Sequence, residues 1–199
     1  MSDAATIVRV GPEHHGTRMS LADFAPADAE PGYTYELEKG IVVVDVPRLP
    51  HSLIVQRVRE ALILYKAAHP GRIFLIAGGS DSVIRLPVME SERHPDLTVY
   101  LTRPPADDDN PWDVWLPDIV VEVVSKSSAQ RDYEIKREEY LRAGIRVYAI
   151  VDPLTRVAML LTRRGDTWEE VRLAADAGLT IPHLPGFSLS LADVFSPVA

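Results

Sequence analysis

The chain has 199 residues, of which 46% are hydrophobic and 25% charged, a composition typical of a globular protein and not of a disordered one. It has no cysteine, which excludes disulfides, iron–sulfur clusters and thiolate zinc sites, and its apolar runs are shorter than a membrane span requires. The formal net charge of −8 speaks against a protein whose main task is to grip nucleic acid backbones without specificity. The first residues lack a basic region followed by an apolar one, so we expect no signal peptide and a cytoplasmic location.

The first part of the chain predicts a loose segment, a hairpin and a long helix. We expect residues 1–17 to be loose and residues 18–199 to form one domain, with a short helix capped by Ser20 near its start. The stretch YTYELEKGIVVVDVP predicts two strands joined by a turn at Lys39–Gly40. The stretch HSLIVQRVREALILYKAA has apolar residues at helical spacing, and the Pro70–Gly71 pair that follows ends this helix.

The middle and the end of the chain predict a mixed sheet. Short strands are expected at RIFLIA, DSVIRL and DLTVYL, before an acidic, proline-rich loop whose three consecutive aspartates we interpret as solvated. Strand 118–124, a helix ending near Arg142 with Gly144 as its cap, and strand IRVYAIVD form a βαβ unit with parallel strands. VAMLLTRR and TWEEVRLA extend the sheet in antiparallel fashion, and LPGFSLSLADVF adds a short strand and a helical turn. The predicted fold class is therefore α/β.

Glu122 interrupts a strand that is otherwise built from branched aliphatic residues. Because side chains alternate along a strand, Glu122 shares a face with Val120 and Val124. An unpaired buried carboxylate costs several kcal/mol, so this glutamate needs a partner. Two interpretations stay open: a place at a sheet edge or in a pair with an arginine, or a role as ligand of a divalent cation. The arginines available for such a pair are Arg131, Arg142 and Arg146.

A second carboxylate repeats this design. Asp96 follows Pro95 and precedes an apolar strand, and it could meet Glu122 if the two strands are neighbours, since adjacent strands lie ~5 Å apart. Asp118 lies four residues before Glu122 on the same strand, hence ~13 Å away, which is too far to share one ion. We interpret Asp118 as a strand-start residue.

The helix after the Glu122 strand carries a lysine on an aromatic face. Tyr133, Lys136, Tyr140 and Gly144 fall on one continuous stripe of this helix. This position would let Lys136 lean toward the carboxylates. The alternative is an Asp132–Lys136 pair at i, i+4 that holds the lysine on the surface.

Several spaced motifs together resemble the Uma-type family of bacterial endonuclease-like proteins, which belongs to the PD-(D/E)XK restriction-endonuclease-like superfamily. The resemblance rests on Asp96 after Pro95, on VVEVVS with Glu122, and on RDYEIKREEY, and it includes YELEKG, IVDP and LPGFSLSL between Tyr33 and Phe195. It implies a restriction-endonuclease-like core with flanking helices, an N-terminal hairpin and an antiparallel edge extension. It also implies an endonuclease that uses Mg²⁺ or Mn²⁺ to hydrolyse phosphodiester bonds in DNA.

The resemblance also implies roles for individual residues. Asp96 and Glu122 would hold the metal, and a lysine would assist the attacking water. The superfamily lysine, two residues after the glutamate, falls on Val124, so the chain departs from that pattern and Lys136 takes its place. The expected catalytic residues are thus Asp96, Glu122 and Lys136. Glu36 matches a glutamate that the family carries near its start, and it would reach the metal directly or through water; the alternative is an exposed strand residue.

Three further residues are candidates for contacts with DNA. His51 precedes or begins the long helix, where it could cap the helix or contact phosphate. Lys126 replaces a proline of the family and could reach phosphate or remain solvated. Arg131 belongs to a group of basic residues that we expect to make the region less acidic than the whole chain. This group comprises Lys126, Arg131, Lys136, Arg137, Arg142 and Arg146.

Two hypotheses for the function follow. The first is a metal-dependent endonuclease acting on DNA. The alternative is a catalytically inactive nuclease-fold module for binding or regulation, which the acidic composition and the missing strand lysine favour. We expect DNA and a second copy of the chain, in a homodimer, as partners. We expect no membrane partner, and no nucleotide cofactor because the chain lacks a glycine-rich phosphate loop.

Overall fold

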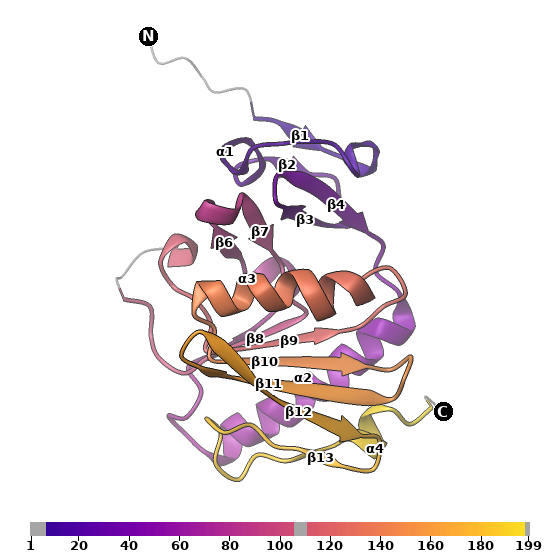
Figure 1. The fold of residues 1–199 in the computed structure, drawn as a ribbon, viewed down its shortest axis with the longest axis vertical. Helices are drawn as coiled ribbons and strands as arrows, with labels where there is room; N and C mark the ends of the chain where they lie inside the picture. The colour runs from indigo at the N-terminus through magenta and orange to yellow at the C-terminus, as the bar shows by residue number, and fades with distance from the viewer. Residues whose placement is uncertain (1–6, 106–110, 198–199) are drawn as a thin grey trace.

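The computed structural model describes residues 7–105 and 111–197, and within these ranges the chain folds around one large and one small β-sheet. Figure 1 shows the large sheet in the middle, with helix α3 in front of it and the long helix α2 behind it. The strands of the small sheet lie above this layer, on the side of the N-terminus. Across the described ranges, no helix combines the length and the apolar character that a membrane span requires.

The large sheet has six strands in the order β12-β11-β10-β9-β8-β5. Strands β9 and β10 are parallel and are joined by a connection that contains α3, whereas the other neighbouring pairs of this sheet are antiparallel. The predicted mixed sheet, its βαβ unit and its antiparallel extension are therefore confirmed. The strands are β5 (Leu75–Ala77), β8 (Leu97–Tyr100), β9 (Ile119–Val123), β10 (Val147–Asp152), β11 (Val157–Arg164) and β12 (Thr167–Ala174).

The small sheet has four strands in the order β4-β3-β7-β6. Strands β3 and β4 form the predicted hairpin, and Lys39 and Gly40 at its turn have positive φ angles of 49° and 77°, as a two-residue hairpin turn requires. Strand β7 was not predicted, because its sequence Ser-Glu-Arg has no apolar residue. It pairs with β3 through Leu37 and Glu92. The strands are β3 (Thr34–Glu38), β4 (Ile41–Asp45), β6 (Ile84–Leu86) and β7 (Ser91–Arg93).

Short elements complete the structure. Ser20 caps the first helix by accepting a hydrogen bond from the Asp23 amide, as predicted. A π-helical segment, Arg131–Ile135, leads into α3, and Gly144 ends α3 with a φ of 91°, a conformation that glycine adopts without strain. The helices are α1 (Leu21–Phe24), α2 (Leu49–Ala68), α3 (Lys136–Ala143) and α4 (Leu191–Val194), and the remaining strands are β1 (Arg9–Val10), β2 (Asp28–Ala29), β13 (Gly178–Leu179) and β14 (Leu189–Ser190).

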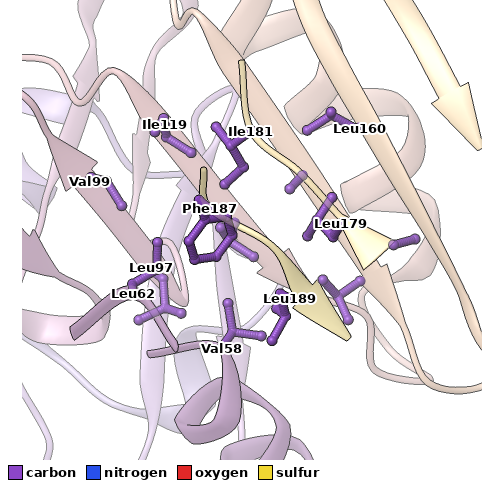
Figure 2. Close-up of a cluster of buried hydrophobic side chains, with 14 of the residues drawn as sticks. Val58, Leu62, Leu97, Val99, Ile119, Leu160, Leu179, Ile181, Phe187 and Leu189 are labelled. Carbon is purple, nitrogen blue, oxygen red and sulfur yellow. The ribbon is translucent and has the colours of Figure 1, made fainter. Parts of the chain in front are cut away.

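The two faces of the large sheet bury different kinds of side chains. On one face, Val121 and Val123 join an apolar core with α2 and the C-terminal segment. Figure 2 shows this core, in which Val58 and Leu62 of α2 lie near Phe187 and Leu189. On the opposite face, Val120 of β9 and Val124, just after it, pack toward α3, and Glu122 lies between them. The carboxylate therefore points into the layer between the sheet and α3.

Part of the N-terminal segment predicted to be loose is ordered. Strand β1 pairs with β2, and the Gly16 amide donates to the Val42 carbonyl at 2.8 Å, while the Val42 amide donates to the Thr17 carbonyl at 2.9 Å. These hydrogen bonds attach residues 16 and 17 to strand β4. The three consecutive aspartates, 107–109, lie outside the described residues.

Candidate functional site

Strands β8 and β9 bring Asp96 and Glu122 together. Their register pairs Leu97 with Val121, which places Asp96, one residue before β8, opposite Glu122. The Asp96 amide donates to Glu122 Oε2 at 3.3 Å, and the Val123 amide donates to Asp96 Oδ2 at 2.8 Å. The adjacency that a shared cation would need is therefore present.

Helix α3 places Lys136 against the same glutamate. The Lys136 Nζ atom lies 3.0 Å from Glu122 Oε1, 3.1 Å from Glu36 Oε1 and 3.6 Å from Asp132 Oδ1. Lys136 is only 4% exposed, so its pair with Asp132 lies inside the protein and not on the surface, where the alternative interpretation put it. A buried ammonium group needs carboxylates close by to compensate for its lost hydration.

Glu36 reaches this lysine from the small sheet. It is buried, so the interpretation of Glu36 as an exposed strand residue is wrong. Its Oε1 atom also accepts a hydrogen bond from the His94 amide at 3.2 Å, and its Oε2 atom accepts one from Arg93 Nη1 at 3.1 Å. Both carboxylate oxygens are thus engaged by donors of this chain.

Arg93 is a fully buried member of the site that the sequence analysis missed. Its guanidinium donates to Glu139 Oε2 at 2.7 Å and also pairs with Glu36 and Glu38. Glu139 lies three residues after Lys136 on the buried face of α3, so the helical stripe that marked Lys136 could have revealed it. Strand β7 has no comparable periodicity, and the sequence gives no such signal for Arg93.

His51 lies at the other end of the pair of carboxylates. Its Nε2 atom is 3.1 Å from Asp96 Oδ2 and 2.9 Å from the Val123 carbonyl oxygen. Both of these atoms are acceptors, so Nε2 carries a proton and donates to them. Burial lowers the pKa of His51, but the contacts with Asp96 and the Val123 carbonyl raise it more, so that the net change is an increase.

The carboxylates around Lys136 differ in their readiness to ionise. Burial, with further contributions from Asp96, Asp132 and Glu36, raises the pKa of Glu122 to about 8, although Lys136 opposes this. Burial also acts to raise the pKa of Glu36, but the nearby Lys136 and the Arg93 guanidinium outweigh it and lower that pKa to about 2. Of the two carboxyl groups nearest the Lys136 ammonium, Glu36 is therefore the one that ionises more readily.

Most of the basic residues expected around the site are paired with carboxylates. Arg131 pairs with Asp45 of β4, and the Ser127 hydroxyl donates to the same carboxylate at 3.0 Å. Lys126 is exposed. The arginines proposed as partners of Glu122 pair elsewhere, so the interpretation of Glu122 as half of an arginine pair is wrong. The other pairs are Arg137–Glu170, Arg142–Glu138 and Arg146–Asp118.

Asp118 has the structural role expected for a strand-start residue. Its Oδ2 atom accepts a hydrogen bond from the Leu101 amide at 2.8 Å, and its Oδ1 atom pairs with Arg146 at 3.2 Å. These contacts join the start of β9 to the end of β8 and to Arg146, which precedes β10, at the end of β9 away from Glu122. Asp118 therefore takes no part in the site.

Among residues 7–105 and 111–197, no three histidine, aspartate or glutamate side chains are placed to hold one metal ion together. The hydrogen bonds of Glu122 and Asp96 are consistent with this finding. The Lys136 ammonium and the Tyr140 hydroxyl bind Glu122 Oε1, and the His51 N–H binds Asp96 Oδ2. Donors of the chain thus bind the oxygens that a cation would use.

The comparison with protein families agrees with this geometry. A family model described as Uma2, "Putative restriction endonuclease", matches residues 21–192. The chain belongs to the Uma2 family. The similarity expected from Asp96, the Glu122 strand and the Lys136 helix is therefore confirmed, and these positions fall within the Uma2 match.

A solved structure is similar in fold to this chain. A protein from Anabaena variabilis, described as "a putative nuclease belonging to DUF820", superimposes on this chain with a TM-score of 0.70 and 19% sequence identity. The match covers 89% of this chain and 97% of that protein. At this identity the likeness shows the fold, and the predicted α/β fold with flanking helices is confirmed. No curated protein matches the chain.

Proposed function

We propose that this Uma2-family chain is a metal-dependent endonuclease that hydrolyses phosphodiester bonds in DNA. The observation that carries the proposal is the convergence of Asp96, Glu122 and Lys136 from a strand start, a strand and a helix within a restriction-endonuclease family. Two carboxylates and a lysine meeting in this way provide the charges that phosphoryl transfer needs.

The residues present fit a hard divalent cation. Asp96 and Glu122 supply oxygen ligands, and the Asp96 side chain is 22% exposed, so solvent reaches it. Mg²⁺ commonly binds one or two carboxylates and completes its shell with water and phosphate oxygens. Asp96 and Glu122 would hold the ion, while His51 would have to withdraw its N–H from Asp96. When bound, such an ion polarises the phosphate and lowers the pKa of a bound water.

The chain's own residues would do the rest. The Lys136 ammonium is adjacent to Glu122 Oε1, where its charge stabilises the ionised glutamate and the negative charge that develops during hydrolysis. The exposed Lys126 follows β9 and would contact a backbone phosphate. His51 and Arg131 flank the site as further candidates for substrate contacts.

A nicking assay on supercoiled plasmid tests the proposal. The wild type should nick DNA with Mg²⁺ or Mn²⁺ and not with a chelator. Asp96→Asn should lose this activity, and it should also lose the rise in melting temperature that Mn²⁺ gives to a protein that binds it in the folded state. The exposed Glu138→Gln serves as control. A wild type with neither nicking nor a metal-dependent melting shift would contradict the proposal.

The second candidate is a non-catalytic binding or regulatory module. Specific observations favour it: Lys136 is enclosed by three carboxylates, and the neighbouring arginines are paired. In this case the chain would bind its partner with no metal-dependent cleavage. The same plasmid assay separates the two functions.

A further inference from the structure

Glu36 stands apart from the other carboxylates of the site. By resemblance it was expected to bind the metal, but its oxygens already meet three partners: Lys136, the His94 amide and Arg93. A carboxylate has about four lone-pair positions, so these contacts use most of them. Lys136 Nζ also lies between Glu36 Oε1 and Glu122 Oε1, at 3.1 Å and 3.0 Å. Glu36 therefore meets the lysine and does not meet Asp96.

The contacts of Glu36 belong to a closed ring. Glu36 binds Arg93, Arg93 binds Glu139, and Glu139 shares helix α3 with Lys136, which binds Glu36 again. The four side chains come from β3, β7 and α3 and are all buried. A ring of this kind fixes both the helix and the end of the lysine side chain, because moving either one breaks an ion pair in a dry interior.

We propose that Glu36 is a positioning residue for Lys136 and not a metal ligand: it holds the ammonium against Glu122, where the lysine serves hydrolysis. This inference rests on the proposed endonuclease function and reassigns one residue within it. It also explains what the small sheet contributes: β3 supplies Glu36, which contacts the lysine, and β7 supplies Arg93, which holds Glu36. Losing an indirect contact of this kind typically costs tenfold to a hundredfold in activity.

The neighbour of Glu36 provides a matched control. Glu38 lies on the same strand and pairs with Arg93 at 3.3 Å, but it has no contact with Lys136. Glu36→Gln and Glu38→Gln each remove one negative charge from Arg93. Only Glu36→Gln also removes an anion from Lys136, and the glutamine oxygen can still accept from the His94 amide, so the difference between the two variants reports the lysine contact.

Two measurements on the full chain test the proposal. Mn²⁺ affinity, from the metal-dependent melting temperature, should agree within about twofold for the wild type and both variants. In plasmid nicking, Glu36→Gln should lower kcat by roughly ten- to a hundredfold at unchanged KM, while Glu38→Gln should leave both near the wild-type values. Glu36→Asp, which keeps the charge but shortens the reach, should fall between Glu36→Gln and the wild type.

A third measurement needs no activity. The chain has four lysines, and reductive methylation followed by mass spectrometry of peptides reports the reactivity of each one. Lys136 should react slowly in the wild type and in Glu38→Gln, and at least about threefold faster in Glu36→Gln, because it has lost the negative charge of Glu36. Urea unfolding of both variants shows whether a difference reflects global stability instead.

The outcomes separate the two proposals. A Glu36→Gln variant that binds Mn²⁺ as weakly as Asp96→Asn would make Glu36 a ligand and overturn the inference. So would a variant that nicks at the wild-type rate or leaves Lys136 protected. If the wild type neither binds Mn²⁺ nor nicks DNA, the endonuclease function fails, whereas the methylation of Lys136 still decides whether Glu36 holds it.

Discussion

The surroundings of Glu122 have an outer end, formed by Asp96 and His51, and an inner end, formed by Lys136 and Arg93. The two ends differ in solvent access and in the number of charged partners. At the outer end, Asp96 and His51 have side chains that are 22% and 26% exposed, and a single proton donated by His51 joins them. At the inner end, Lys136 and Arg93 are buried among carboxylates. Exchange of a hydrogen bond for a cation is easy in water and costly in a dry interior. The outer end is therefore the place for a ligand that comes and goes, and the inner end is a fixed support.

The largest effect should come from removing the charge at the inner end. Lys136→Met keeps most of the side-chain volume but leaves three buried carboxylates without their ammonium, so we expect a loss of about 3–5 kcal/mol in the free energy of unfolding. Adding Glu122→Gln to this variant should recover part of the loss. Urea denaturation measures both, with the exposed Lys126→Met as control. A loss below about 1 kcal/mol would remove the contrast between the two ends.

A smaller effect, with a defined pH dependence, should follow from Glu122→Gln. The pKa of Glu122 rises from 4.5 to about 8 on folding, so between these values the folded protein keeps a proton that the unfolded chain releases. This group therefore makes the wild type less stable as pH rises from 5 to 8. Glutamine cannot release a proton, so the variant should gain on the order of 3 kcal/mol relative to wild type over that range.

Urea titrations of both proteins at pH 5 and pH 8 measure this gain, with Glu138→Gln, which replaces an exposed glutamate outside the site, as the control. A stability difference that is the same at both pH values would mean that Lys136 keeps Glu122 ionised throughout. In that case Lys136 and Glu122 would form a full ion pair over this pH range, and Glu122 would not keep its proton.

The smallest effect should come from Lys126, at the surface beyond the outer end. Lys126→Ala should change the free energy of unfolding by less than about 0.5 kcal/mol. It should weaken binding to a labelled DNA duplex and lower the slope of log K against log salt by about one, as the loss of one phosphate contact does. Fluorescence anisotropy at several salt concentrations measures this slope. An unchanged slope would place the DNA contact elsewhere.

The elements that could be predicted from the sequence are those whose residues follow a regular local pattern. Apolar spacing gave the long helix α2, alternation and turn residues gave the β3–β4 hairpin, and strand–helix–strand order gave the parallel pair β9 and β10. Asp96 and Glu122 stood out because a carboxylate beside or within an apolar strand needs a physical reason. Such patterns are local, so a single sequence displays them.

The partners of the buried charges were not predictable in this way. Arg93 lies in a three-residue strand without apolar residues, and it is buried only because Glu36 and Glu139 approach it from other elements. Ion pairs between distant segments follow no period along the chain. The same reason explains why the carboxylate partners of the arginines near Glu122 were not foreseen.

The origin of the ring residues also bears on how the chain folds. Glu122 and Lys136 are 14 positions apart, within one βαβ unit, whereas Arg93 and Glu36 are 57 apart. Closing a longer loop costs more chain entropy, and contacts at large sequence separation form late. We therefore expect the βαβ unit to collapse first, with Lys136 beside the two carboxyl groups of that unit, Glu122 and Asp132, and the N-terminal hairpin to dock afterwards. Docking of the hairpin would then be the step at which the lysine acquires its third carboxylate, Glu36, and becomes fixed.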